Sequence, residues 1–204
     1  MLSYQTIAPH TLELLRLLMA QPLLSGTRLV GGTSLALQYG HRNSIDLDFF
    51  GSLNDDLLAF HLCLESIGRL RVIKETKTIR IYDLEGVKID FVDYARYPWL
   101  VDAVEEDGLR LASPMDIAAM KINAIEGRGS RKDFVDIYYL LQHYSLEDIL
   151  GFYQKKYPEY SMFRALMSLT YFEDAEKQVM PKMFTKDTWE EIKSYIIGEV
   201  EKIR

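Results

Sequence analysis

The chain has 204 residues, of which 48% are hydrophobic, so it is long enough to bury one substantial core together with a helical annex. Its formal net charge of −6 argues against broad, sequence-independent adhesion to nucleic acid, which needs a cationic surface. The sequence contains no run near the ~20 apolar residues that span a bilayer, and it begins without an export signal. Because Cys63 is its single cysteine, no disulfide can form within the chain, and we expect a cytoplasmic protein with no membrane partner.

The first hundred residues predict a mixed sheet with helices. Strands are expected at 28–30, 44–50, 71–73, 79–84 and 87–92, the last two joined as a hairpin through Glu85-Gly86. Helices are expected over 9–20, over 55–67, and from the glycines after the first strand to Gly40. Period-2 and helical patterns therefore alternate in this half, as they do in an α+β fold.

Beyond residue 99 the β signals largely disappear and helical patterns take over. They cover 114–125, 132–143, 146–157 and about 188–204. We therefore predict an α+β fold with two parts, a mixed-sheet core flanked by helices over residues 1–100 and a helical subdomain packed on it over 101–204. The transition itself falls near 98–112.

A glycine turn leads from the first strand into a helix at Gly31-Gly32-Thr33-Ser34. Glycines let backbone N–H groups approach phosphate oxygens closely, and the positive end of the helix dipole favours an anion. The hydroxyls of Thr33 and Ser34 would add donors. A tight strand-to-helix turn without a ligand is the commoner meaning of such glycines, so this motif needs support from its neighbours.

Asp46 and Asp48 follow closely, in a predicted strand. Residues two apart in a strand face the same side, so the two carboxylates would project together while Ile45, Leu47 and Phe49 face the packed side. Parallel carboxylates repel each other unless a cation neutralises them, and hard oxygen ligands suit Mg²⁺ or Mn²⁺. An exposed structural pair remains the alternative.

A third carboxylate is expected on a neighbouring strand. Asp90 lies in the β-branched and aromatic run 87–92, which should be central in the sheet, where a carboxylate needs a partner. Asp93 is the alternative, but it faces the other side at the end of the strand, where turn-capping aspartates are common. We therefore favour Asp90 as the third metal ligand.

Further charged candidates follow. The helix that carries Lys121 is apolar almost all round, so this ammonium needs an anion, either a phosphate or an acidic cluster, unless it reaches solvent along its stem. Asp133 and Asp136 share a face of the next helix, away from its apolar stripe, and could line a cleft or be solvated. Arg42 follows a helix-ending glycine and could orient Asp46 or a phosphate.

Three segments carry a resemblance to a known family. They are GGTSLALQYGHRNSIDLDFF, KIDF and SPMDIAAMKINAIEGRGSRKDFVDIYYLL, within residues 28–143. The chain resembles the AbiEii family of nucleotidyltransferases, known as toxins of abortive-infection systems. The resemblance implies a polymerase-beta-like nucleotidyltransferase fold with a glycine turn, an Asp-x-Asp pair, a later acidic strand residue, a lysine-bearing helix and an Asp-x-x-Asp motif.

The resemblance also implies roles by position. Gly32 and Thr33 would contact a triphosphate and Lys121 would steady a phosphate. The residues that would hold the metal are Asp46, Asp48 and Asp90, and those that match the last motif are Asp133 and Asp136. A threonine follows the glycine here where many nucleotidyltransferases have serine, but either hydroxyl can donate to a phosphate oxygen.

Together these features predict Mg²⁺- or Mn²⁺-dependent transfer of a nucleoside monophosphate from an NTP to an RNA, such as a tRNA end, or to a protein. The resemblance further suggests a neutralising antitoxin as a partner. The alternatives are a nucleotide-binding regulatory module without transfer and an Asp-x-Asp glycosyltransferase. A haloacid-type phosphatase fits poorly, because Phe50 stands where that chemistry wants a small hydroxyl residue.

Overall fold

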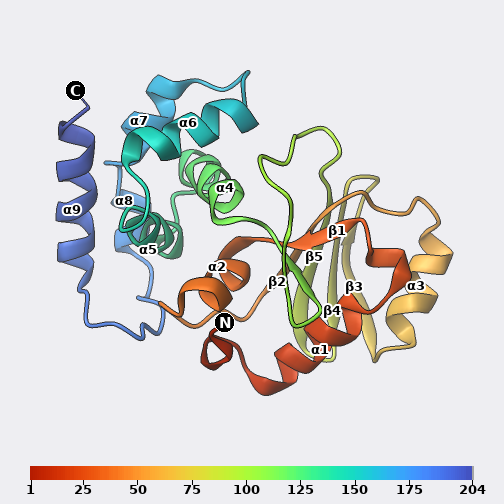
Figure 1. The fold of residues 1–204 in the computed structure, drawn as a ribbon. Coiled ribbons are helices and arrows are strands. Elements are labelled where there is room, and N and C mark those ends of the chain that lie inside the picture. Colours follow the sequence, from red (N-terminus) through yellow and green to blue (C-terminus); the bar gives the residue numbers. More distant parts are fainter. Residues whose placement is uncertain (204) are drawn as a thin grey trace. The chain divides into compact units, whose positions relative to one another are not determined.

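The computed structural model describes residues 1–203 and divides into two compact units. The sheet unit comprises Met1–Pro98 and Asp102–Ala112, and the helical unit comprises Trp99–Val101 and the chain from Ser113 onward. The chain therefore leaves the sheet unit briefly at Trp99–Val101, returns to it for a hairpin, and then enters the helices (Figure 1).

Within the described residues, seven strands form one mixed sheet in the order β3-β4-β5-β2-β1-β7-β6. The pairs β2–β5 and β1–β7 are parallel and the other neighbours are antiparallel. The predicted α+β class with a mixed sheet is confirmed. The strands are β1 (Thr27–Leu29), β2 (Leu47–Gly51), β3 (Leu70–Glu75), β4 (Ile79–Leu84), β5 (Val87–Asp93), β6 (Val104–Glu106) and β7 (Leu109–Leu111).

One face of the sheet carries the core of this unit. Leu47 lies opposite Ile89 and Phe49 opposite Phe91, and all four side chains are fully buried. Phe60 of α3 packs edge-on against Phe91 at 5.0 Å, so burial on this face, at about 1.5–3 kcal/mol per large apolar side chain, holds helices to the sheet. The helices of this unit are α1 (Pro9–Met19), α2 (Gly31–Tyr39), α3 (Leu57–Glu65) and the short 3-10 turns Tyr4–Thr6 and Pro22–Leu24.

The strand expected at 44–50 begins later, at Leu47. The carbonyl of Asp46 accepts a hydrogen bond from the Thr33 hydroxyl, so this residue belongs to the loop before the ladder. The expectation that Ile45 faces the packed side is wrong, since 70% of its surface is exposed. The alternation of buried and polar side chains holds only from Leu47 onward.

The hairpin of β6 and β7 is not predicted by the sequence analysis, which expected the β signals to fade beyond 99. Its turn is Asp107-Gly108, with φ values of 53° and 77°. Arg110 of β7 donates to the carbonyl oxygens of Met19, Leu24 and Thr27 at 3.0–3.2 Å. These bonds attach the hairpin to the sheet unit. The sheet unit therefore includes Asp102–Ala112, which lie after the boundary at residue 100 expected from the sequence.

Up to residue 203, the helical unit contains the four helices expected from the sequence and two short ones, α7 and α8, that were not expected. Ser113, Ser145, Ser161 and Thr188 cap four helix N-termini through their hydroxyls. The predicted end of the last helix at Arg204 lies outside the described residues. No helix within residues 1–203 is long and apolar enough to cross a membrane. The helices are α4 (Pro114–Gly127), α5 (Arg131–Leu140), α6 (Leu146–Lys156), α7 (Met162–Ser168), α8 (Glu173–Glu176) and α9 (Trp189–Glu201).

Candidate functional site

The glycine turn between β1 and α2 brings backbone and charged side chains into close contact. Gly31 has a φ of +67°, and a Cβ at this position would lie 2.5 Å from Oδ2 of Asp48. A Cβ on Gly32 would lie 2.1 Å from Nη2 of Arg42. The backbone conformation at Gly31 favours glycine, and a side chain at Gly32 would have to displace the end of the Arg42 side chain. The start of α2 thus lies against one carboxylate and one guanidinium.

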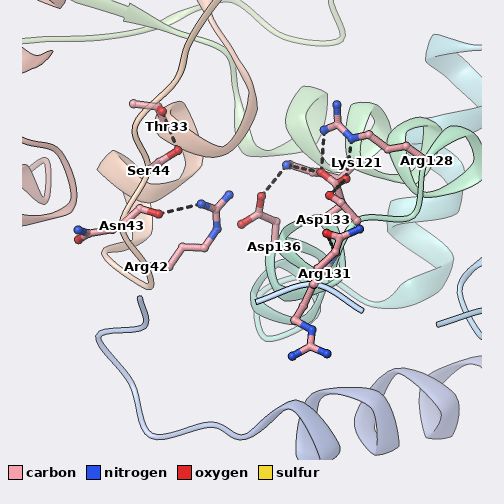
Figure 2. A network of polar contacts seen from close by, with 11 residues as sticks. Thr33, Arg42, Asn43, Ser44, Lys121, Arg128, Arg131, Asp133 and Asp136 are labelled. Carbon is pink, nitrogen blue, oxygen red and sulfur yellow. Dashed lines mark hydrogen bonds and ion pairs between the residues drawn. The ribbon is translucent and has the colours of Figure 1, made fainter. Parts of the chain in front are cut away.

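The hydroxyls that were expected to meet a phosphate are buried within the turn. Thr33 Oγ1 lies 2.8 Å from the Ser44 hydroxyl and also bonds the Asp46 carbonyl, and 1% of the residue is exposed (Figure 2). Ser34 is fully buried and accepts from the Gln38 side-chain amide at 3.3 Å. The Thr33 hydroxyl therefore holds α2 to the loop before β2, whereas the Ser34 hydroxyl bonds a side chain of α2 itself, and a phosphate contact for either stays a prediction.

The three carboxylates expected to hold a metal belong to one part of the sheet. Asp48 of β2 lies directly opposite Asp90 of β5 in the parallel register, so the two side chains share a face. Asp46 precedes β2 by one residue. Asp93 lies at the end of β5, where Oδ1 accepts from the Ala95 N–H at 3.1 Å, the turn-capping role weighed for it.

Asp90 has its cationic partner within the same strand. Lys88 lies two residues earlier on the same face, and its Nζ is 2.6 and 2.7 Å from the two carboxylate oxygens of Asp90. Lys88 keeps 46% of its side chain exposed, so the pair lies at the surface of the sheet. The partner that the sequence analysis expected Asp90 to need in this strand is thus supplied by Lys88.

The donor set fits a hard divalent cation in its chemistry, because Asp46, Asp48 and Asp90 offer carboxylate oxygens and two of them are in register. The geometry is less complete. Within residues 1–203, no group of three His, Cys, Asp or Glu side chains is arranged to hold a metal ion. A cation here would have to draw the carboxylates together and would compete with the Lys88 ammonium for Asp90.

Arg42 is 2% exposed and lies beside the start of α2. Its Nη1 donates to the Asn43 carbonyl at 2.9 Å, which turns the guanidinium back along its own loop (Figure 2). The positive charge near Gly32 adds to the positive end of the helix dipole. Because a valine at the N-cap, Val30, cannot accept a hydrogen bond through its side chain, the first N–H groups of α2 depend on other acceptors.

In the helical unit, Lys121 of α4 pairs with two carboxylates of α5. Its Nζ lies 2.9 Å from Oδ1 of Asp133 and 2.6 Å from Oδ2 of Asp136 (Figure 2). Lys121 retains 5% side-chain exposure and both aspartates none. The next helix supplies the anion that this lysine needs, a pairing that the sequence analysis did not make. The alternative that the two aspartates are solvated is wrong, because neither side chain is exposed. A phosphate contact for Lys121 and a nucleotide-binding role for the aspartates stay predictions.

Asp133 is held by further donors. Arg128 donates from Nε at 2.9 Å and from Nη2 at 3.1 Å, and the Ser130 hydroxyl also bonds this carboxylate. Burial by itself raises the pKa of Asp133, but the charges of Lys121 and Arg128 and the hydrogen bonds outweigh it and hold the pKa well below its usual range. Asp133 therefore stays ionised at neutral pH.

A second buried ion pair in this unit was missed from the sequence. Lys156 of α6 donates to Asp116 at 2.7 Å, and neither side chain is exposed. Asp116 also accepts from the Leu100 N–H and from the Ser113 hydroxyl, while Ser113 caps the helix by accepting from the Asp116 N–H. The signal was a lysine at an apolar helical position of the 146–157 pattern.

A family model and a relative cover most of this chain. Residues 13–202 match the family model described as nucleotidyl transferase AbiEii toxin, type IV TA system. The uncharacterized protein aq_aa25 of Aquifex aeolicus (strain VF5) is 34% identical over 180 residues, which are 85% of this chain and 86% of that protein.

Two solved structures from Helicobacter pylori resemble the fold. JHP933 has a TM-score of 0.54 at 17% identity, with 97% of this chain and 94% of that one covered. A protein described as a candidate nucleotidyltransferase has a TM-score of 0.52 at 19% identity, with 97% and 99% covered. At these identities the likeness is one of fold, and it extends over both units.

Proposed function

Since the chain belongs to the AbiEii family of nucleotidyl transferase toxins of type IV toxin–antitoxin systems, we propose that it moves a nucleoside monophosphate from an NTP to an acceptor hydroxyl with the help of Mg²⁺ or Mn²⁺. The observation that supports this most is the register of Asp48 opposite Asp90, beside the glycine turn. The proposed acceptor is an RNA, such as a tRNA end, or a protein, and the proposed protein partner is a cognate antitoxin.

The carboxylates of Asp46, Asp48 and Asp90 would hold the cation. When bound, the cation would neutralise charge on the phosphates and on the attacking and leaving oxygens. Asp90 would then exchange its Lys88 partner for the cation, because Lys88 is half exposed and can swing into solvent. A surface pair of this kind contributes little to stability, so the exchange costs the fold little.

The start of α2 would hold the triphosphate. The first backbone N–H groups of the helix and the helix dipole favour an anion, and Gly31 and Gly32 add no side chain of their own at this point. The guanidinium of Arg42 beside Gly32 adds a positive charge. Thr33 would act mainly by fixing α2 to the loop of Asp46, since its hydroxyl bonds the Asp46 carbonyl, whereas the Ser34 hydroxyl is held within α2 by Gln38.

Lys121, Asp133 and Asp136 admit two roles. The family motif supports a phosphate contact for Lys121, whereas its two buried carboxylate partners support a role in holding α4 to α5. We propose that Lys121 positions these helices and that Asp133 and Asp136 act through it. The stability of a Lys121 variant separates the two roles.

The test is transfer of label from each NTP, radiolabelled at the α-phosphate, to total RNA and to a protein lysate with Mg²⁺ present. Wild type is compared with the variant Asp46→Asn plus Asp48→Asn and with Asp93→Asn, a matched control on β5. We expect the double variant to lose at least about 10³-fold in rate, since the cation contributes several kcal/mol to the transition state, and Asp93→Asn to stay near wild type. Equal labelling by wild type and the double variant would refute the site.

A second candidate is a nucleotide-binding module without transfer. It is favoured by the Lys88 ammonium on both oxygens of Asp90 and by the lack of a preassembled three-ligand metal group within residues 1–203. Metal-dependent NTP binding without label on any acceptor would support this candidate over transfer. The glycosyltransferase alternative draws no support from the family match.

A further inference from the structure

Arg80 is a buried cation on the opposite face of the sheet from the carboxylates. It lies across from Phe91 in the β4–β5 register, whereas Asp90 lies across from Ile81. Arg80 is 2% exposed, and its guanidinium carbon stacks 4.6 Å from the centre of the Phe60 ring. Arg80 thus belongs to the side of the sheet that α3 covers.

The guanidinium is only partly satisfied. Nη2 donates to the Asn54 carbonyl at 2.8 Å. Nε and Nη1 are buried and have no hydrogen-bond partner among the residues that the structure describes. Buried guanidinium donors are nearly always paired, so these two nitrogens point to an acceptor supplied from outside the chain.

Arg80 also contributes to the lining of a pocket. Its volume is about 580 Å³, within the range of small-molecule sites of roughly 300 to 1,000 Å³. The walls come from the loop before α3 and from the β3–β4 turn, where Thr76 Oγ1 and the Ile79 backbone bond each other and fix the turn. The lining residues are Asp55, Leu57, Glu75, Thr76, Lys77 and Arg80.

Glu75, an acidic residue of the lining that interacts electrostatically with Arg80, already accepts hydrogen bonds from other side chains. Glu75 Oε1 accepts from His61 Nε2 at 2.7 Å and from the Tyr82 hydroxyl. Rotating Glu75 to pair with Arg80 would leave Tyr82, which is fully buried, without this acceptor. Glu75 therefore does not serve as the hydrogen-bond acceptor for Nε and Nη1 of Arg80.

We propose that this pocket binds the carboxylate group of a small molecule, with Arg80 as the buried anchor and Lys77 at the rim. The lining holds two acidic and two basic side chains, so its charges balance before a ligand binds. A carboxylate adds one negative charge against the two unsatisfied nitrogens, whereas a phosphate or triphosphate would place two or more beside Glu75 and Asp55. Leu57 offers apolar contact to the body of the ligand.

The test follows the Nε–Hε resonance of Arg80 in the intact ¹⁵N-labelled protein while sodium butyrate is added at constant ionic strength. Arg80→Lys, which lacks this resonance, assigns it. We expect a saturable shift with a dissociation constant on the order of 1 mM, about two- to fivefold weaker in Lys77→Ala and unchanged in Lys74→Ala, an exposed lysine of β3 outside the pocket.

Two results would overturn the proposal. A shift that does not saturate, or that is the same in Lys77→Ala and Lys74→Ala, would show only general screening by salt. Inorganic phosphate that binds more tightly than butyrate would refute the carboxylate assignment. If Arg80→Lys does not fold, the two lysine variants still decide between specific binding and screening, with protection against thermal unfolding by butyrate as the measurement.

Discussion

Lysine and aspartate meet in both units of this protein, at Lys88 and Asp90 of β5 and at Lys121 with Asp133 and Asp136 across α4 and α5. In the sheet unit the lysine is 46% exposed and the aspartate 21%. In the helical unit the corresponding values are 5% for the lysine and 0% for both aspartates. The residue types are the same, and their burial differs.

This difference decides what each cluster can do. An exposed pair contributes little to stability, so its members can change partners and bind a cation. Removing one member of a buried pair leaves an uncompensated charge and is strongly destabilising. We therefore propose that the carboxylates of the sheet exchange their partner for a cation, and that the cluster of Lys121, Asp133 and Asp136 holds α4 to α5.

The sharpest test of this assignment is Lys121→Met. Losing the ammonium leaves the carboxylates of Asp133 and Asp136 buried with one fewer partner, and we expect a loss of about 3–5 kcal/mol in the free energy of unfolding. Lys155→Met, an exposed lysine of α6, is the matched control and should change it by less than about 0.5 kcal/mol. Denaturant titration measures both. If Lys121→Met keeps its stability but loses transfer, the phosphate contact is correct and the comparison fails.

The pH dependence of stability gives the next largest effect. Because the pKa of Asp133 is lowered in the folded protein, its ionised form stabilises the fold above the unfolded pKa near 4, and this contribution is lost as the pH falls through the folded pKa. We expect Asp133→Asn to cost about 2 kcal/mol at neutral pH, with the gap to wild type narrowing below about pH 4.

The control for this effect is Asp174→Asn, which removes the same charge from an exposed position of α8. Its cost should be small, because the side chain is exposed. Urea unfolding at a series of pH values measures the gap for each variant. A gap for Asp133→Asn that stays constant down to about pH 3 would show that its charge is not what stabilises the cluster.

The elements that the sequence predicts well are those with several alternations or helical turns. The β4–β5 hairpin has long strands around Glu85-Gly86, both with positive φ, and its period of 2 correctly separates Asp90 from the core-facing Phe91. The β6–β7 hairpin has strands of three residues, too short for a period to show. Its Asp107-Gly108 turn was the available signal.

The polar networks were harder to predict, because their partners lie on other elements. The apolar surroundings of Lys121 indicate that it needs an anion, but which anion depends on how the turn at Gly129 aims α5. The burial of Arg80 could be inferred because it lies two residues from Tyr82 and so on the same face of β4. That two of its nitrogens have no hydrogen-bond partner could not be inferred, since this depends on the path of the loop at Asn54.

The smallest predicted effect concerns Lys88, and it tests the exchangeable side of the comparison. If the cation replaces the Lys88 ammonium on Asp90, Lys88→Ala removes a competitor and should tighten Mn²⁺ binding by about two- to fivefold, as the modest strength of an exposed pair allows. Lys74→Ala, also exposed and on the edge strand β3, two strands away from β5, controls for the loss of one surface charge.

Paramagnetic titration with Mn²⁺ at constant salt measures the affinity for wild type and both variants. Tighter binding in Lys88→Ala alone would mean that Asp90 is a ligand and that the Lys88 ammonium competes with the cation for it. Equal affinities in all three would mean that the Lys88 ammonium does not compete with the cation for Asp90, since a competing positive charge 2.6 Å from Oδ1 of Asp90 should weaken cation binding. In that case the pair on β5 is as structural as the one between α4 and α5, and burial does not separate the two clusters.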